Sequence, residues 1–298
     1  MTLAARVSAQ AKINLLLRVL ARESSGYHSI ETIFQRIDLA DDVTVRVATG
    51  RALDCTGPAM PAAGLGATER NLAYRAAAAY ADATGWPTGF AIEIVKRIPV
   101  GGGLGGGSAD AGAVLRALDV LSPRPIGSSA LVELAAPLGA DVPFMTVEQP
   151  TALGWGRGER LMPLPTPSPR PVVLLIPDFS IPTADAYLWV AEERGLYAPA
   201  ASMLPANATA DWQAVARGAA NDFQPVVARP HPEIAELVDE LRAAGATVAM
   251  LAGSGSSVFG VFESAPDVAA IARSAGVSAI TTRTSDVVAR VVRAELDR

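Results

Sequence analysis

Apolar and polar positions alternate along two early segments of the chain. Residues 6–20 (RVSAQAKINLLLRVL) and 41–49 (DDVTVRVAT) follow the two-residue period of a strand with one buried face. Residues 69–85 are alanine-rich and end at Gly85, which predicts a helix. A further strand is predicted over 90–100, and it leads directly into the glycine run GGGLGGG. Two more helices are predicted beyond that run, over residues 108–121 and 128–139.

A proline-rich stretch divides this pattern in two. Residues 161–171 (LMPLPTPSPRP) hold five prolines and predict a stiff connector, so we place a domain boundary near residue 165, between domains 1–165 and 166–298. The second domain begins with a strand and a helix for which Thr183 is the expected N-cap. A helix, two strands around a glycine–serine turn, a helix and a strand follow, over 232–245, 246–262, 266–276 and 277–284. That order is typical of a ferredoxin-like split βαβ layer, and the expected fold class is α+β with two domains.

Composition narrows the function classes. The chain has 298 residues, half of them hydrophobic, and its formal net charge of −5 leaves no general basic surface for nucleic acid or anionic lipid. No uncharged apolar run approaches the ~18–20 residues that cross a bilayer. A single cysteine, Cys55, excludes an internal disulfide and fits a reducing compartment. We therefore expect a cytoplasmic protein without nucleic-acid or membrane partners, in which any anionic ligand needs a locally built site.

The glycine run at 101–107 predicts such a site. Glycine is the costliest residue to order, so six glycines beside a helix need a physical reason. A strand, a glycine loop and a helix N-terminus together bind anions, because free N–H groups and close approach of the backbone both favour phosphate. Ser108 adds a hydroxyl, and Lys96 and Arg97 add cations. The alternative is a flexible turn or tight packing of helix against strand.

Other motifs fit the glycine-rich segments less well. A Walker loop needs lysine and then serine or threonine after its last glycine, but Ser108 and Ala109 follow here. The dinucleotide pattern GxGxxG also occurs in the run, without the second strand and acidic residue that it requires. GSGSS at 253–257 lacks the GxSxG elbow of a serine nucleophile. For that segment, a hairpin turn and a second glycine loop facing the same ligand both remain open.

Several stretches together resemble the GHMP small-molecule kinases over nearly the whole chain. AKINLLLRVL, GYHSIETIFQRIDLAD, IPVGGGLGGGSADA and LGADVPF carry the resemblance, and residues 181–187, 219–227 and 251–259 support it. AKINL with GYH and GADVPF is similar to the subgroup that acts on 4-diphosphocytidyl-2-C-methyl-D-erythritol. The resemblance implies that ATP phosphorylates the 2-hydroxyl of this cytidine diphosphate compound, in non-mevalonate isoprenoid biosynthesis. It also implies a ribosomal-protein-S5-like ATP domain, a C-terminal ferredoxin-like domain and an active site in the cleft between them.

The resemblance also implies roles for particular residues. Asp141 in LGADVPF falls on the catalytic base, and a positioned carboxylate can accept the proton that the hydroxyl loses. Lys12 falls on the lysine beside that base, where it can keep the aspartate ionised and offset charge on the transferring group. Without the motif, Asp141 would be a turn residue and Lys12 a surface lysine.

The resemblance implies that another set of residues binds the cytidine end of the substrate. Asn14 lies two positions after Lys12, so both side chains are expected on one face of a strand. Tyr27 and His28 match residues that hold the pyrimidine. Tyr187 stands where an aromatic residue that stacks on the cytosine is expected, and the alternative is that its ring packs in the core. Thr183 matches a substrate-contacting position, which its capping role would explain equally well.

ATP is the expected co-substrate, with Mg²⁺ bridging its phosphates rather than held by a dedicated protein cluster. Asn71 falls on a segment that lines the adenine pocket. The remaining expected ATP-binding residues are Lys96, Pro99, Val100, Gly101, Gly102, Gly103, Leu104, Gly105, Gly106, Gly107, Ser108 and Ala109. The chain is expected to be a monomer or a homodimer.

Two positions depart from the family pattern. Gln10 replaces the usual proline before Ala-Lys, and SADAG replaces the common Ser-Ser-Asn-Ala. Asp110 suits the helix dipole but would repel phosphate if it faced the site, and it could instead face the bound metal. The competing functions are another GHMP kinase, acting on homoserine, mevalonate or a sugar, and a catalytically silent nucleotide-binding module.

Overall fold

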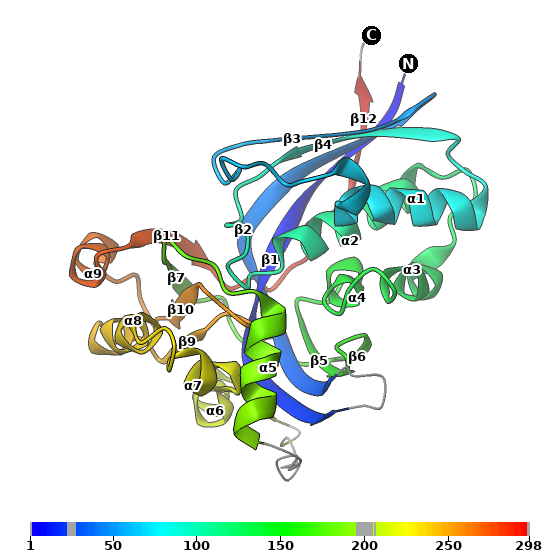
Figure 1. The fold of residues 1–298 in the computed structure, drawn as a ribbon. Helices are drawn as coiled ribbons and strands as arrows, with labels where there is room; N and C mark the ends of the chain where they lie inside the picture. The colour runs from blue at the N-terminus through cyan, green and yellow to red at the C-terminus, as the bar shows by residue number, and fades with distance from the viewer. Residues whose placement is uncertain (1, 23–27, 195–204, 206, 297–298) are drawn as a thin grey trace.

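The computed structural model describes residues 2–22, 28–194, 205 and 207–296. Its elements form two layered units, each with one sheet (Figure 1). The first sheet has the strand order β12-β1-β2-β4-β3, with β5 and β6 continuing from β2, and β8 beside β1. The second sheet has the order β11-β7-β10-β9. A residue boundary at 165 falls between β6 and β7, which belong to different sheets.

The first sheet is built around two long antiparallel strands. These are β1 (Thr2–Arg22) and β2 (His28–Ala48), whose register is interrupted between Gln10 and Lys12 and again between Asn14 and Leu16. The shorter strands of this sheet are β3 (Arg51–Thr56), β4 (Gly89–Val95), β5 (Thr151–Gly156), β6 (Arg160–Pro163), β8 (Ala220–Asn221) and β12 (Val292–Leu296). The alternation of residues 6–20 thus predicts only the middle of a much longer strand.

Four helices lie on one face of this sheet (Figure 1). They are α1 (Leu72–Thr84), α2 (Gly106–Leu121), α3 (Gly127–Ala135) and α4 (Val142–Thr146), preceded by the short 3₁₀ turn η1 (Thr68–Arg70). The predicted end of the first helix is confirmed, because Gly85 caps α1 with a left-handed φ of 70°. Helix α2 contacts β1, β2, α1 and α4, and its side chains are buried over most of its length. It is therefore the central helix of the N-terminal unit.

The second sheet confirms the split βαβ order. Each pair of adjacent strands in this sheet is antiparallel: β11 with β7, β7 with β10, and β10 with β9. Their bounds are β7 (Pro171–Ile176), β9 (Val248–Leu251), β10 (Val258–Val261) and β11 (Ser278–Arg283). The helices of this unit are α5 (Thr183–Arg194), α6 (Trp212–Gly218), α7 (Phe223–Val227), α8 (Glu233–Ala243) and α9 (Val268–Ala275). The Pro182 carbonyl accepts the hydrogen bond of the Ala186 amide at 3.3 Å, and the Thr183 hydroxyl bonds to Ser254, so the expected N-cap at Thr183 is wrong by one position.

The two units are tied together by returning segments of the chain. Strand β12 pairs with β1 in an antiparallel register from Thr2–Leu296 to Arg6–Val292, and β8 pairs with β1 in parallel. Gln10, at the position where the family usually has proline, donates a hydrogen bond to the Ser285 hydroxyl at 3.0 Å and accepts one from the Ala289 amide. Within the described residues, no helix is both long and apolar enough to cross a membrane.

Candidate active site

The glycine run forms the loop between β4 and α2. Helix α2 begins at Gly106, and its N-cap is Gly105, which has a left-handed φ of 73° and so favours glycine. The first amides of α2 consequently lack acceptors within the helix, and the loop meets the positive end of the helix dipole. Beside these amides lies a hollow of about 170 Å³. Its shape and its free N–H groups suit a phosphate chain.

Most of the expected ATP-binding residues line this hollow. Asn71, Lys96 and the whole segment from Pro99 to Gly107 are among its walls, whereas Ser108 and Ala109 are not. The Asn71 side chain also caps α1 by accepting a hydrogen bond from the Ala73 amide at 2.9 Å. The loop and the start of α1 therefore face the same space.

The segment GSGSS is a hairpin turn, the first of the two open alternatives, and its residues are not among the walls of the hollow. It is the turn between β9 and β10, and it packs directly against the glycine loop from the other unit. The Ser257 amide donates to the Gly102 carbonyl at 3.3 Å. A Cβ on Gly103, whose φ is 76°, would lie 1.8 Å from the Ala252 carbonyl oxygen. The turn thus supports the back of the glycine loop, and only glycine fits at that contact.

Beneath the loop lies a buried cluster of charges. Lys96 Nζ is bonded to a carboxylate oxygen of Asp41 and, at 2.6 Å, to Asp110 Oδ2. All three side chains are at least 96% buried. The expected cation at Lys96 is therefore engaged by two carboxylates, and Arg97 is likewise bonded to Asp42 at the surface. The sequence did not reveal Asp41 as part of this site, because an aspartate at the junction DD is indistinguishable from a surface residue.

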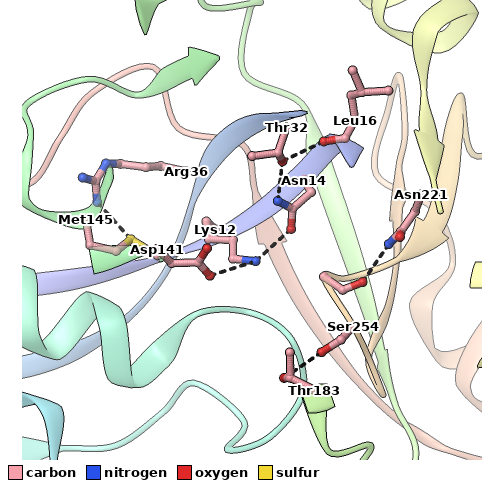
Figure 2. A network of polar contacts seen from close by, with 11 residues as sticks. Lys12, Asn14, Leu16, Thr32, Arg36, Asp141, Met145, Thr183, Asn221 and Ser254 are labelled. Atoms are coloured by element: carbon pink, nitrogen blue, oxygen red, sulfur yellow. Dashed lines mark hydrogen bonds and ion pairs between the residues drawn. The ribbon is translucent and has the colours of Figure 1, made fainter. Parts of the chain in front are cut away.

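Lys12 and Asp141 meet on the other side of the loop (Figure 2). Lys12 Nζ lies 3.3 Å from Asp141 Oδ2 and donates a hydrogen bond to Asn14 Oδ1 at 2.8 Å. Asn14 in turn donates to the Thr32 hydroxyl, which donates to the Leu16 carbonyl, both at 2.7 Å. The expected shared face of Lys12 and Asn14 is confirmed by this contact. A Cβ on Gly105 would lie 3.1 Å from Lys12 Cε, so the lysine also touches the glycine loop.

A buried arginine on β2 binds the helix α4, which follows directly after Asp141. Arg36 donates to the carbonyls of Phe144 and Val147, at 2.7 and 2.9 Å, and its guanidinium lies over the Phe144 ring. Burial, with a smaller contribution from the charge of Arg116, lowers the pKa of Arg36 to about 9. Sequence reasoning missed Arg36, because nothing in FQRID indicates which carbonyls its side chain reaches.

A second group of expected residues meets across the two units. The His28 and Tyr187 rings stack with centroids 5.2 Å apart and an interplanar angle of 14°. Burial raises the pKa of Tyr187 to about 12, and the charge of Asp141 adds to this effect. The Thr183 hydroxyl lies 3.0 Å from the Ser254 hydroxyl (Figure 2), a partner that the sequence did not predict. Tyr27 lies outside the described residues.

Comparison with known proteins defines the class. The model of the GHMP kinases N terminal domain matches residues 71–149, and that of the GHMP kinases C terminal domain matches residues 203–277. The 4-diphosphocytidyl-2-C-methyl-D-erythritol kinase of Pelotomaculum thermopropionicum is 41% identical over 284 residues, covering 93% of this chain and 96% of the relative. The chain therefore belongs to the GHMP kinases, and within them to the family of 4-diphosphocytidyl-2-C-methyl-D-erythritol kinases.

Solved structures agree with this assignment. The crystal structure of a 4-(cytidine 5'-diphospho)-2C-methyl-D-erythritol kinase has a TM-score of 0.74 and 36% identity, covering 94% of this chain and 98% of that one. A homoserine kinase from Cytophaga hutchinsonii has a TM-score of 0.69 at 18% identity and covers 97% of both chains, which shows the shared fold alone. The expected two-domain GHMP kinase fold and an ATP-dependent kinase are thereby confirmed.

Proposed function

We propose that this kinase transfers the γ-phosphoryl group of ATP to the 2-hydroxyl of 4-diphosphocytidyl-2-C-methyl-D-erythritol, in isoprenoid precursor biosynthesis. Two relatives that carry this name, at 41% and 39% identity, support the substrate. One structural observation carries the chemistry: Lys12 contacts both the Asp141 carboxylate and the glycine loop. A base and a phosphate-binding backbone thus share a single cation.

In the proposed reaction, the triphosphate lies along the amides that begin α2. Asp141, whose side chain is 27% exposed, accepts the proton of the 2-hydroxyl as that oxygen attacks the γ-phosphorus. The bond from the γ-phosphorus to the bridging oxygen breaks, and ADP leaves with the electron pair. Lys12 offsets the negative charge that spreads over the transferring group.

Mg²⁺ enters this scheme as part of MgATP, the form in which the ion neutralises the phosphates. Among the described residues, no group of three or more histidine, cysteine, aspartate or glutamate side chains is arranged to hold a metal ion. The site therefore suits an ion that is carried mainly by phosphate oxygens and water.

The cytidine end is proposed to bind where β2 and α5 meet. Asn14, His28, Thr183 and Tyr187 are the proposed contacts, together with Tyr27 from outside the described residues. The stacked His28 and Tyr187 rings offer an aromatic face for a pyrimidine close to Asp141. This arrangement favours a cytidine compound over the small acceptors of other GHMP kinases.

The test is acceptor-dependent ATP turnover. ADP release should require 4-diphosphocytidyl-2-C-methyl-D-erythritol, and homoserine, mevalonate or galactose should not replace it. Turnover with one of those acceptors would support another GHMP kinase. ATP binding without turnover on any acceptor would indicate a catalytically silent module.

The proposal extends to the setting of the enzyme. A lone Cys55, half-buried and not in a disulfide, fits a reducing cytoplasm. The proposed oligomeric state is a monomer or a homodimer. Light scattering at working concentrations distinguishes these two states.

A further inference from the structure

The charge cluster beneath the glycine loop has one carboxylate more than it has cations. Asp41 comes from β2, Lys96 follows β4, and Asp110 lies in the second turn of α2. The two carboxylates share the single ammonium group of Lys96. With both aspartates ionised, the cluster carries one net negative charge on side chains that are at least 96% buried.

The two aspartates are not equivalent. Asp41 Oδ1 accepts hydrogen bonds from the amides of Arg97 and Ile98, at 2.5 and 2.8 Å, and its other oxygen binds Lys96. Both oxygens of Asp41 therefore have hydrogen-bond donors. Asp110 is bonded to Lys96 through Oδ2, but its Oδ1 is buried without a hydrogen-bond partner among the described residues. A buried oxygen without a donor is costly when charged, so Asp110 is the member that can give up its charge.

This cluster adjoins the proposed phosphate site. Lys96 and Asp110 both line the hollow beside the glycine loop, and Lys96 Nζ would be 3.6 Å from a Cβ on Gly106. A triphosphate on this loop adds several negative charges next to a cluster that is already negative. Two like charges at such short range in a poorly solvated place repel each other strongly.

Among the described residues, Lys96 is the cation bonded to Asp110, and no second one is paired with it in place of a proton. Lys96 is shared, and the Arg97 guanidinium is bonded to Asp42 at the surface. Cys55 on β3 also feels this cluster: burial first, and then the charge of Asp110, raise the pKa of its thiol to about 11, so it stays neutral. The charged groups facing Asp110 are thus Lys96 and Asp41.

We propose that Asp110 takes up one proton when the glycine loop binds a nucleoside triphosphate, so that the loop meets a neutral cluster. The proton comes from solvent and binds Oδ1 of Asp110, and no other bond changes. The protonated group then offers an O–H donor where the free oxygen lies. The role rests on the proposed function only in taking the glycine loop as the ATP site.

The protonation state of the free protein agrees with this role. Burial raises the pKa of Asp110 to about 7, with the charge of Lys96 opposing and that of Asp41 adding to the shift. For Lys96, burial lowers the pKa, but the two carboxylates outweigh it and the net shift is upward. The upward shift means that Asp110 holds a proton more readily than an ordinary aspartate does, and the charge of bound phosphates favours that proton further.

The test is calorimetric titration of the full chain with a magnesium-bound, non-hydrolysable ATP analogue. Buffers of different ionisation enthalpy at pH 6, 7 and 8 report the number of protons taken up per nucleotide. Between pH 7 and 8, the wild type should take up about half a proton or more beyond the uptake of Asp110→Asn, and its Kd should rise by up to about tenfold relative to that variant. Ionisation of the nucleotide itself is common to both proteins and cancels.

Asp42→Asn is the matched control, because Asp42 neighbours Asp41 but pairs with Arg97 at the surface. It should match the wild type in proton uptake. Equal uptake by Asp110→Asn and the wild type would overturn the proposal. So would a variant that binds the metal-free analogue normally but the magnesium form poorly, since Asp110 would then be a metal contact.

The titration distinguishes a failure of the Asp110 inference from a failure of the proposed kinase function. Proton-linked nucleotide binding without turnover on the cytidine acceptor would leave this inference intact and remove the proposed substrate. A wild type that binds no nucleotide would overturn both.

Discussion

Lys12 Nζ lies 3.3 Å from Asp141 Oδ2, and the two side chains differ in exposure, at 4% for the lysine and 27% for the aspartate. The ammonium group is thus enclosed between β1, the glycine loop and α4, whereas the carboxylate keeps an open side. An approaching alcohol can reach the carboxylate, while the lysine is fixed by Asn14 behind it. This asymmetry suits a base that must meet substrate and a cation that must not move.

Replacing Asp141 with Asn should lower kcat by about 10²–10⁴-fold, because the side chain keeps its shape but no longer accepts a proton. The KM values for both substrates should change little. Steady-state kinetics measure this, with Asp42→Asn as a surface control. Turnover close to the wild-type rate would remove Asp141 from its proposed role.

Two glycines of the loop should respond differently to alanine. Gly103→Ala should destabilise the protein by at least ~2 kcal/mol, since φ is left-handed and the new Cβ meets the Ala252 carbonyl. At Gly107 the nearest described atom to a Cβ is Leu72 Cδ1 at 3.7 Å, so Gly107→Ala should fold normally. Thermal unfolding measures both effects. Nucleotide titration of the folded Gly107→Ala protein then shows whether phosphate approaches that residue.

Arg36→Lys should destabilise the protein by roughly 1–3 kcal/mol, because one ammonium group cannot replace a guanidinium that donates to three backbone carbonyls, of Phe144, Val147 and Gln149. It should also lower kcat, as α4 would no longer hold Asp141 in place. Denaturant unfolding and kinetics below the unfolding range test the two effects separately. Arg46→Lys on the same strand, where the arginine pairs with Glu93 at the surface, should change neither.

His28→Ala should raise the KM of the cytidine substrate while leaving ATP affinity unchanged, because the lost ring belongs to the proposed pyrimidine site. Tyr187→Phe should bind substrate normally, since the ring remains, and Tyr187→Leu should not. Binding of cytidine 5'-diphosphate is a sufficient readout. An equal loss of affinity for both ligands in His28→Ala would point to damage to the fold.

The stability of the enzyme should decrease as pH rises towards 7. The folded-state pKa of Asp110 is about 7 and its ordinary value is 3.8, so the folded protein binds more protons between these values. Stability contributed by the neutral form is present below about pH 4 and is lost as pH rises through 7. Asp110→Asn should flatten that dependence, with a gain of at most about 4 kcal/mol at pH 8. Denaturant midpoints between pH 5 and 8 measure the slope.

Much of the fold could be predicted from local signals. The helix that ends at Gly85, the loop between β4 and α2, and the βαβ order of the second unit follow from periodicity and glycine positions. The strands β3, β5, β6, β8 and β12 could not be predicted, because they are short and depend on pairing with distant segments. The first half of β2 was missed for a related reason: its residues are buried on both faces, so HSIETIFQRIDL shows no clean alternation.

The contacts of the candidate site could likewise be predicted only in part from the sequence. The contact of Lys12 with Asn14 follows from strand geometry, but its meeting with Asp141 depends on the packing of α4 against the sheet. The carboxylates that bind Lys96 could not be predicted from the sequence. A lysine near a glycine loop suggests phosphate binding, and only the folded chain shows that Asp41 and Asp110 lie against it. Likewise, Ser254 and Thr183 are 71 residues apart and meet only when the turn between β9 and β10 packs beside the start of α5.

The contact between Gly103 and the turn at 252–257 has a consequence for engineering. Exchanging the carboxy-terminal half for that of another small-molecule kinase, in order to change the acceptor, would remove the wall against which the nucleotide loop rests. A working chimera would have to take the glycine loop and the turn at 252–257 from the same protein. The choice of acceptor and the binding of nucleotide therefore cannot be redesigned independently.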